Sequence, residues 1–171
     1  EGVKAGLLAD PIFANGTYTD VPEAGIRAFA RIWAGWGPSQ AFYRHKLHQK
    51  LGQETAADHM QEFWEPNFLA FDANDLLGML HTWQVANIAD NDLYKGDFEA
   101  ACKAITAKTI LMPCETDLYF PVADNEIQAS LMTNVELRPI PSDWGHIAGA
   151  PGLNPIDSAF IDNAHSELLA S

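Results

Sequence analysis

The stretch TILMPCETDLYFP, residues 109–121, decides the fold of this chain. Its first five residues, 109–113, form a short apolar run, which is typical of a strand buried on both faces of a parallel sheet. Polar residues follow this run, and a helix is predicted over 121–132. The stretch therefore predicts a buried strand, a polar loop at its carboxyl end and a helix that leads away from the sheet.

A second strand and further helices surround this stretch. Residues 135–140 have the pattern of another strand, and Asp97 can cap a short helix before the first strand. Asn154 followed by Pro155 opens a last helix. The order helix–strand–helix–strand–helix implies parallel strands with right-handed crossovers, hence an α/β layer. Two strands are too few for a stable sheet, so we expect the remaining strands from outside this chain.

The region from Pro22 to about Asn91 carries only helical patterns, with no strand between them. Its first helix follows Pro22 and ends at Gly35-Trp36-Gly37-Pro38. The second is predicted to begin at Ser39 and to carry Tyr43, Leu47 and Leu51 on one face. The third begins at Thr55, where Asp58 completes a capping box, and the fourth begins at about Asp72. The region is therefore predicted to be an all-helical insertion.

Composition excludes several classes of function. The 171 residues contain 10 Lys and Arg against 23 Asp and Glu, a net charge of −13, which disfavours binding to nucleic acid or to an anionic membrane. The 47% hydrophobic content and five Trp argue against disorder. No apolar run is long enough to span a membrane, so we expect a soluble protein, in the cytoplasm rather than elsewhere, although the sequence does not name the compartment. Cys102 and Cys114 have no metal-type spacing and suggest no disulfide framework.

Two loops could carry chemistry, each at the carboxyl end of a predicted strand, where open parallel sheets place their active sites. Asp117 follows the first strand and His146 follows the second. An acid after one strand and a histidine after the next is the order in which α/β-hydrolases present two members of their triad. Taken singly, the Asp is more often a turn residue and the His a surface residue. Glu115 is the nearest rival for the acid, and Asp143 fits a turn.

No nucleophile is evident in the chain. There is no Gly-x-Ser-x-Gly motif and no cysteine flanked by glycines, and the serines lie at caps, on helix faces or at termini. His45, His48 and His59 are expected to be solvated. The spacing of His45 and His48 lacks a third ligand, so we predict no metal site. His81 either lines a pocket or packs, and His165 is expected to be exposed.

Four motifs in order resemble the homoserine O-acetyltransferase-like α/β-hydrolases over nearly the whole chain. They are LADP (8–11), FDAN (71–74), TDLYFP (116–121) and SDWGH (142–146). The resemblance implies that this is the C-terminal part of the hydrolase, with Asp117 as triad acid and His146 as general base. It also implies that residues 1–21 connect to the hydrolase core, 22–95 form a helical lid and 96–171 form the C-terminal part of the core.

One position departs from the family pattern. The homoserine enzymes usually have an Asp directly after the catalytic His, where it contacts the amino group of the substrate, but this chain has Ile147. An apolar side chain cannot pair with an ammonium group, so homoserine is not the expected acceptor. Ile147, Trp83 and Trp144 are the predicted residues of the substrate pocket.

We therefore expect a subunit or fragment of a serine esterase that acts through an acyl-enzyme. The alternatives are an O-acyltransferase with an alcohol acceptor other than homoserine, and a non-catalytic ligand-binding module of the same fold. The expected partners are a nucleophile-bearing N-terminal chain of the same precursor, which makes a heterodimer of a processed protein, and a small-molecule ester. Homodimerisation through the lid is a further possibility. No cofactor is implied, and Ser and Cys both stay open as the nucleophile.

Overall fold

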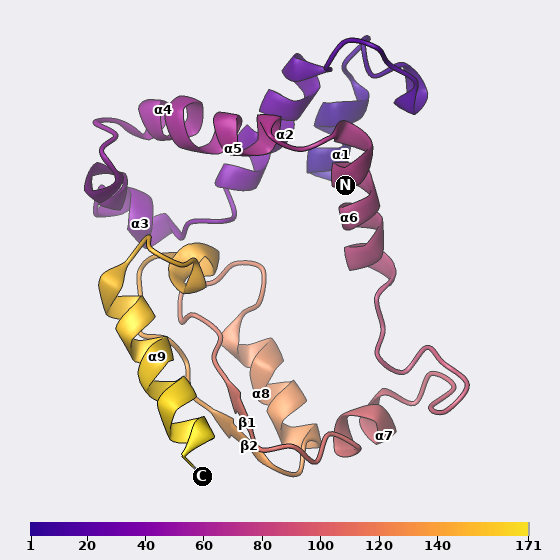
Figure 1. The fold of residues 1–171 in the computed structure, drawn as a ribbon, viewed down its shortest axis with the longest axis vertical. Coiled ribbons are helices and arrows are strands. Elements are labelled where there is room, and N and C mark those ends of the chain that lie inside the picture. Colours follow the sequence, from indigo (N-terminus) through magenta and orange to yellow (C-terminus); the bar gives the residue numbers. More distant parts are fainter. Residues whose placement is uncertain (171) are drawn as a thin grey trace. The chain divides into compact units, whose positions relative to one another are not determined.

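The structure is a computed structural model that describes residues 1–170. Its contacts divide the chain into two compact units (Figure 1). The helical unit comprises Glu1–Trp36 and Lys46–Ala86, and the sheet unit comprises Gly37–His45 together with the chain from Asn87 onward. The segment Gly37–His45 thus packs with the sheet unit, although it lies in sequence between two parts of the helical unit. The assignment of 1–21, 22–95 and 96–171 to connection, lid and core stays a prediction.

The sheet unit is built on two parallel strands, β1 (Thr109–Leu111) and β2 (Val135–Leu137). The register pairs Ile110 with Glu136, and an isolated bridge between Cys114 and Ile140 continues the pairing. Both strands are shorter than predicted, since Pro113 and Pro139 have no N–H to donate to a ladder. The prediction that the first strand is fully buried is wrong for the described chain. All three residues of β1 are half-buried, because the strand has a paired neighbour on only one edge.

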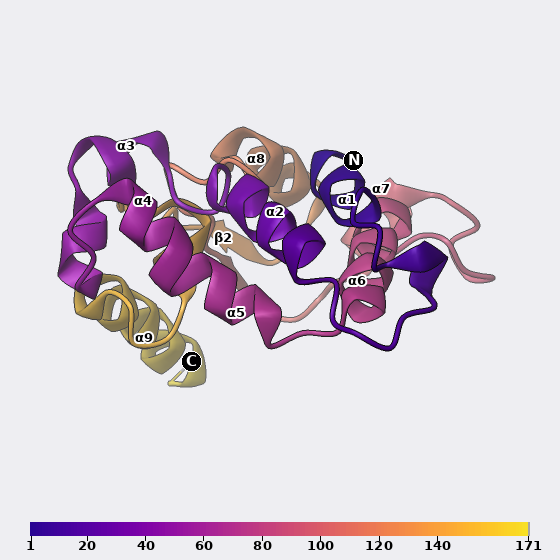
Figure 2. The same cartoon turned by 90° about the horizontal axis from the view of Figure 1, so that it is seen from above.

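Two longer helices flank the sheet, α8 (Val122–Leu131) and α9 (Pro155–Leu169), and the short helix α7 (Phe98–Lys103) contacts α8. Figures 1 and 2 show α8 and α9 on opposite faces of the two strands. Both caps predicted here are confirmed: the Asp97 carboxylate accepts from the amide of Ala100, and the Asn154 side chain accepts from the amide of Ile156. The α/β layer predicted from the sequence is therefore present.

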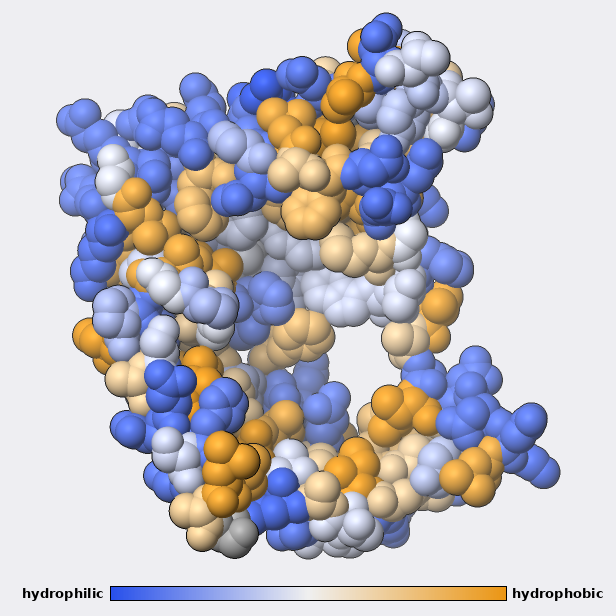
Figure 3. All heavy atoms as spheres, in the orientation of Figure 1, coloured by the Kyte–Doolittle hydropathy of each residue, from blue (hydrophilic) through white to orange (hydrophobic). Residues whose placement is uncertain are grey.

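The helical unit contains α1 (Gly2–Leu8), α2 (Glu23–Ala34), α4 (Ala56–Asp58), α5 (Glu65–Leu69) and α6 (Ala73–Val85), with the π-helix His59–Trp64 between α4 and α5. Its core is aromatic: Phe29 stacks on Trp33, and Phe68 packs against both rings. The helix α1 was not predicted. Figure 3 shows hydrophobic side chains at the surface of both units, and the most exposed large ones are Leu93, Ile156 and Leu169.

Two buried carboxylates join helices within this unit. Asp10 accepts hydrogen bonds from the amides of Ile12 and Gly25, at 2.8 and 2.7 Å, and so ties the end of α1 to the start of α2. Glu65, with a side chain only 4% exposed, accepts from Arg27 and Arg31 at 2.6 Å each and ties α5 to α2. The LADP motif therefore has a packing role in this structure.

The predicted second helix is interrupted. Ser39 caps α3 (Gln40–Arg44) as expected, but the chain turns at Lys46, whose φ is +54°, and continues as a 3-10 helix over Leu47–Leu51. The capping box of Thr55 and Asp58 is confirmed by both of its hydrogen bonds. The predicted fourth helix, now α6, begins at its Asp72 cap as expected.

The prediction that three histidines of this region are solvated is correct only for His45. His48 and His59 are 3% and 0% exposed. Their nitrogens have polar partners that make burial tolerable: His59 Nδ1 contacts the side-chain oxygen of Gln53, and the indole of Trp64 donates to His59 Nε2 at 2.9 Å. Burial, together with the neighbouring His48, lowers the pKa of His59 to about 4, so the ring is neutral at physiological pH.

Candidate active site

The acid loop follows β1 and is folded by its own aspartate. One carboxylate oxygen of Asp117, Oδ1, accepts hydrogen bonds from the amides of Tyr119 (2.7 Å) and Phe120 (3.1 Å). This is the Asx-turn that an aspartate at the start of a turn commonly makes. The amide of Asp117 in turn donates to the carbonyl of Cys114. The turn uses Oδ1 and leaves the second oxygen, Oδ2, available for another partner.

The histidine loop follows β2 and is anchored at Ser142. The Ser142 hydroxyl donates to the buried carboxylate of Asp157 on α9 at 2.8 Å and accepts from the amide of Trp144. A 3-10 helix, η4, then runs over Gly145–Gly149 and carries His146 in its first turn. The loop is therefore held to α9 before it presents the histidine.

The two loops bring Asp117 and His146 together. His146 Nδ1 lies 3.1 Å from Asp117 Oδ2, and the side chains are 30% and 7% exposed, respectively. An ionised carboxylate can only accept a hydrogen bond, so Nδ1 carries the proton and the other ring nitrogen, Nε2, is the basic one in the neutral ring. This is the tautomer that a general base in a triad requires.

Hydrogen bonds keep Asp117 ionised despite its burial. Burial by itself raises the pKa of the Asp117 carboxyl, but the hydrogen bonds from His146, Tyr119 and Phe120 outweigh it, and the resulting pKa lies below the ordinary value of 3.8. The imidazole is also enclosed by the rings of Tyr119 and Phe120, whose centroids lie 5.0 and 5.4 Å from its own. Burial and the charge of Asp117 raise the pKa of Tyr119, so this phenol stays neutral.

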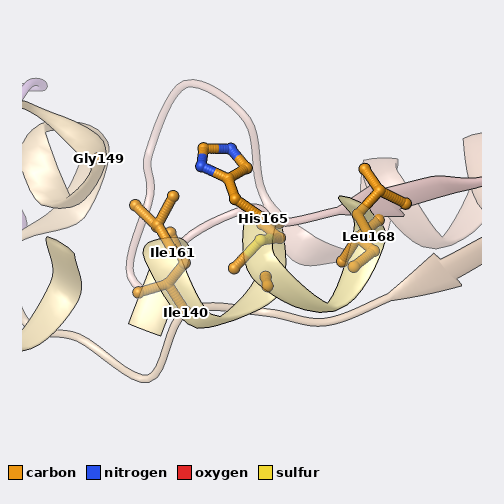
Figure 4. Close-up of a pocket in the computed structure, with 8 residues that line it drawn as sticks. Ile140, Gly149, Ile161, His165 and Leu168 are labelled. Carbon is orange, nitrogen blue, oxygen red and sulfur yellow. The ribbon is translucent and has the colours of Figure 1, made fainter. Parts of the chain in front are cut away.

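Asp117 and His146 line a cavity of about 270 Å³ in the sheet unit. Its wall also contains Cys114, Phe120 and Gly145. A second cavity of about 330 Å³ shares Ile140 with the first and is lined mainly by apolar side chains. Figure 4 shows Ile161, His165 and Leu168 of α9 on this second cavity. Only the first cavity combines an acid and a base.

The three predicted pocket residues lie elsewhere. Ile147 and Trp144 are 8% and 3% exposed, and Trp144 packs edge-on against Phe42. Trp83 belongs to the helical unit, where it stacks on Trp33 and is 41% exposed. None of the three is among the residues that line either cavity. Their contact with a substrate stays a prediction.

The side chains of the other acidic residues of the two loops, Glu115 and Asp143, make no hydrogen bond to His146. Glu115 is exposed and bonds through its backbone to Ile140, and the Asp143 carboxylate contacts His45 Nδ1 at 2.8 Å. Asp117 is therefore the acid that the structure pairs with His146.

Within residues 1–170, the His146 ring has no serine or cysteine partner. Its contacts are Asp117, Tyr119 and Phe120. The hydroxyls of Ser39 and Ser142 donate to Asp143 and Asp157, and Cys114 Sγ donates to the carbonyl of Ser142. The same residues contain no cluster of His, Cys, Asp and Glu side chains that could hold a metal ion. None of their helices combines the length and the apolar character that crossing a membrane requires.

Sequence reasoning missed the residues that support this pair. The amide of His146 donates to the carbonyl of Gly37 at 2.8 Å, and the Ser39 hydroxyl donates to the carbonyl of Asp143. Thr116 bonds across to the histidine loop. The Gly-Pro-Ser sequence at 37–39 indicated a helix start and nothing more, because contacts over a hundred positions leave no local pattern.

Comparison with known proteins shows which proteins this chain resembles. No protein-family model matches the chain. A probable esterase of Corynebacterium glutamicum is 33% identical over 81% of this chain and 40% of its own length, and the ethyl acetate hydrolase of Pseudomonas veronii is 33% identical over 96% and 47%. The crystal structure of an acetylester hydrolase from C. glutamicum superposes with a TM-score of 0.92 at 30% identity, over 99% of this chain and 48% of that one.

Homoserine O-acetyltransferases are more distant. The enzyme of Nostoc punctiforme is 24% identical over 86% of this chain and 44% of its own length. The structure of the Bacillus anthracis enzyme superposes with a TM-score of 0.73 at 19% identity, over 94% of this chain and 46% of that one, which is a likeness of fold. The chain thus spans about half the length of the curated relatives it matches. It has the fold of the C-terminal part of an α/β-hydrolase and belongs to the α/β-hydrolase family that includes the homoserine O-acetyltransferases and these esterases.

Proposed function

We propose that this chain contributes the acid and the general base of an ester hydrolase that works through an acyl-enzyme, and that the nucleophile comes from a part of the enzyme outside this chain. The observation that carries the proposal is the 3.1 Å contact between Asp117 Oδ2 and His146 Nδ1 on a shared cavity, at the ends of two adjacent parallel strands. The esterase relatives at 33% identity support the same reaction class.

Each of the two residues has a defined role in this reaction. His146 Nε2 removes the proton of a serine hydroxyl or cysteine thiol as its oxygen or sulfur attacks the ester carbonyl. The imidazolium that forms is stabilised by the ionised Asp117 across Nδ1, and it returns the proton to the oxygen of the leaving alcohol. Water then attacks the acyl-enzyme, with His146 again as the base, and releases the acid and the free nucleophile.

Acetyl esters of uncharged alcohols are the proposed substrates. Two of the relatives are named for the hydrolysis of acetyl esters. Ile147, next to His146, offers no carboxylate to an amino group, so an amino-alcohol acceptor such as homoserine is disfavoured. Transfer of the acyl group to another alcohol shares the acyl-enzyme and is the second candidate. A non-catalytic binding module is the third, and the ionised Asp117, which orients the His146 ring, argues against it.

The helical region 22–95 is proposed as the lid of this enzyme and 96–171 as part of its core, with 1–21 as the connection between them. The proposed partner is an N-terminal part that carries the nucleophile, either as a separate chain in a heterodimer or in the same polypeptide. Native and denatured masses of the purified protein distinguish these arrangements, and the native mass also tests homodimerisation through the lid.

The function is tested in the complete enzyme, which contains this chain and the nucleophile-bearing part, by hydrolysis of p-nitrophenyl acetate. His146→Ala and Asp117→Asn are each expected to lower kcat by at least about 10³-fold, since both act on the same proton transfer. His165→Ala is the matched control, because His165 lies on α9 at the second cavity. Turnover of H146A close to that of H165A would exclude His146 as the base. Release of acetate by wild-type enzyme without an added alcohol favours hydrolysis over transfer.

A further inference from the structure

The acid loop and the histidine loop are joined at a second point besides the Asp117–His146 contact. The residue before the acid, Thr116, is half-buried, and its hydroxyl Oγ1 donates to the carbonyl of Ser142 at 2.8 Å. The same oxygen accepts a hydrogen bond from the amide of Gly145 at 3.1 Å. One hydroxyl therefore bonds to both ends of the turn 142–145, which leads directly into His146.

A threonine hydroxyl is suited to this contact because it has one proton to donate and lone pairs to accept. The carbonyl of Ser142 needs a donor, and the amide of Gly145 needs an acceptor. The thiol of Cys114 also reaches the carbonyl of Ser142, at 3.2 Å, but a thiol is a weaker hydrogen-bond donor and acceptor than a hydroxyl. Valine has the shape of threonine but can make neither bond.

The turn is also held by the segment Gly37–His45. The amide of His146 donates to the carbonyl of Gly37. Gly145 has a φ of +67°, and a Cβ at this position would lie 2.6 Å from the amide nitrogen of Ser39. The backbone of Gly145 and His146 thus contacts Gly37 and Ser39 and is also bonded to Thr116.

We infer that Thr116 is a positioning residue for the acid–base pair: its hydroxyl sets the spacing between the two loops at which Asp117 Oδ2 and His146 Nδ1 meet. Thr116 and Asp117 are consecutive, and so are Gly145 and His146. The bond between the Thr116 hydroxyl and the Gly145 amide and the bond between Asp117 and His146 are therefore neighbouring hydrogen bonds between the same two loops. Loss of the Thr116–Gly145 hydrogen bond lets the Asp117–His146 hydrogen bond lengthen. Misplacement of a general base by about 1 Å costs on the order of 10²-fold in rate.

This inference rests on the proposed function, because a positioning residue matters to kcat only if the pair that it positions is catalytic. The experiment compares Thr116→Val and Thr116→Ser in the complete enzyme, with p-nitrophenyl acetate as substrate. Thr109→Val is the matched control, since Thr109 lies on β1 of the same sheet unit and its hydroxyl donates only to the nearby carbonyl of Ala107.

T116V is expected to lower kcat by about 10- to 100-fold with KM within about threefold of wild type. The position of His146 affects proton transfer in the transition state and not the binding of the substrate. T116S, which retains the hydroxyl, is expected to restore kcat to within about threefold of wild type, and T109V to match wild type. Equal kcat values for T116V and T109V, or a T116S variant as slow as T116V, would overturn the inference.

A spectroscopic readout separates this inference from the proposed function. The proton between His146 Nδ1 and Asp117 is expected to give a resonance far downfield of the backbone amides, assigned by its loss in H146A. The resonance should persist in T116S and T109V, and in T116V it should shift upfield or broaden. A T116V spectrum identical to that of wild type would refute the positioning role whatever the activities are. A wild-type kcat in H146A would instead refute the proposed function. The resonance in T116V would then still test whether Thr116 positions the pair.

Should T116V not fold, the amide of Gly145 in the wild-type enzyme provides the test. Its bond to Thr116 Oγ1 predicts slow hydrogen exchange. Exchange at the rate of an open loop would overturn the inference.

Discussion

Replacement of Gly145 by alanine tests how tightly the histidine loop is held. Gly145 is buried, directly precedes His146 and has a φ of +67°, a left-handed conformation that alanine adopts at a cost. An added Cβ would also lie 2.6 Å from the amide nitrogen of Ser39 and 2.9 Å from the carbonyl oxygen of Gly37. Both obstacles are backbone atoms, which cannot rotate away as a side chain can.

The two costs can be separated in magnitude. The left-handed conformation costs about 1–2 kcal/mol for an L-residue, and overpacking of a buried site adds about 1–3 kcal/mol. Ordinary contact with a Cβ begins near 3.4 Å, so the loop must retreat by the difference from 2.6 Å, which is about 0.8 Å. The Asp117–His146 contact is only 3.1 Å, and such a displacement along it would exceed hydrogen-bonding distance.

The assay compares Gly145→Ala with Gly152→Ala in the complete enzyme, by kcat on p-nitrophenyl acetate and by thermal unfolding. Gly152 is the matched control because its φ is +80° but no atom lies within 4 Å of an added Cβ. G145A is expected to lose about 10²-fold in kcat, while G152A retains wild-type kcat. G145A should also unfold at a temperature at least about 2 °C below that of G152A. Equal kcat and equal unfolding temperatures for the two variants would refute the reasoning.

The remaining predictions concern the helical unit. Gly25→Ala would place a Cβ 2.8 Å from Asp10 Cβ and from the carbonyl oxygen of Leu7, and it is expected to destabilise by about 1–3 kcal/mol. Gly78→Ala meets nothing within 4 Å and should stabilise by about 0.5–1 kcal/mol, so the two thermal unfolding midpoints should move in opposite directions, and a shift in the same direction would contradict one of the two expectations. The pKa of Glu65 is below its ordinary 4.5, since its hydrogen bonds to two arginines outweigh the opposing effect of burial. Its contribution to stability is therefore complete above about pH 4.5 and disappears as the pH falls through the lower folded pKa. The urea midpoints of wild type and Glu65→Gln should converge between about pH 6 and pH 3, and a constant gap would argue against this role.

Helix starts could be predicted from the sequence because the interactions that make them are local. The cap side chains accept hydrogen bonds from amides two or three positions later, so residue type and spacing are sufficient evidence. The predicted caps that make these bonds are Ser39, Thr55, Asp97 and Asn154. The end of α3 was missed for the converse reason. Nothing in residue type indicates that Lys46 adopts a φ of +54°.

The approach of Asp117 to His146 could be anticipated from topology. Two parallel strands that are neighbours end at the same edge of their sheet, so residues that follow them meet there. The sequence could not indicate which atoms hold them in place. Ser39 and Asp143 are 104 positions apart, and Thr116 and Gly145 are 29 apart. The burial of His59 escaped prediction in the same way, since its polar neighbours in sequence suggested a solvated face.

The hydrogen bonds that orient His146 all lie within the sheet unit. The carboxylate of Asp117 fixes Nδ1, Gly37 fixes the backbone amide, and Thr116 fixes the preceding residue. The basic nitrogen is therefore aimed before any nucleophile is present, which removes a reorganisation cost from the reaction step. In the proposed enzyme the nucleophile-bearing part then has to bring an activated hydroxyl or thiol, and donors for the oxyanion, to a base that is already in position. Activity should accordingly depend on how well the two parts dock, and it should respond to changes at the histidine loop even where they touch no substrate.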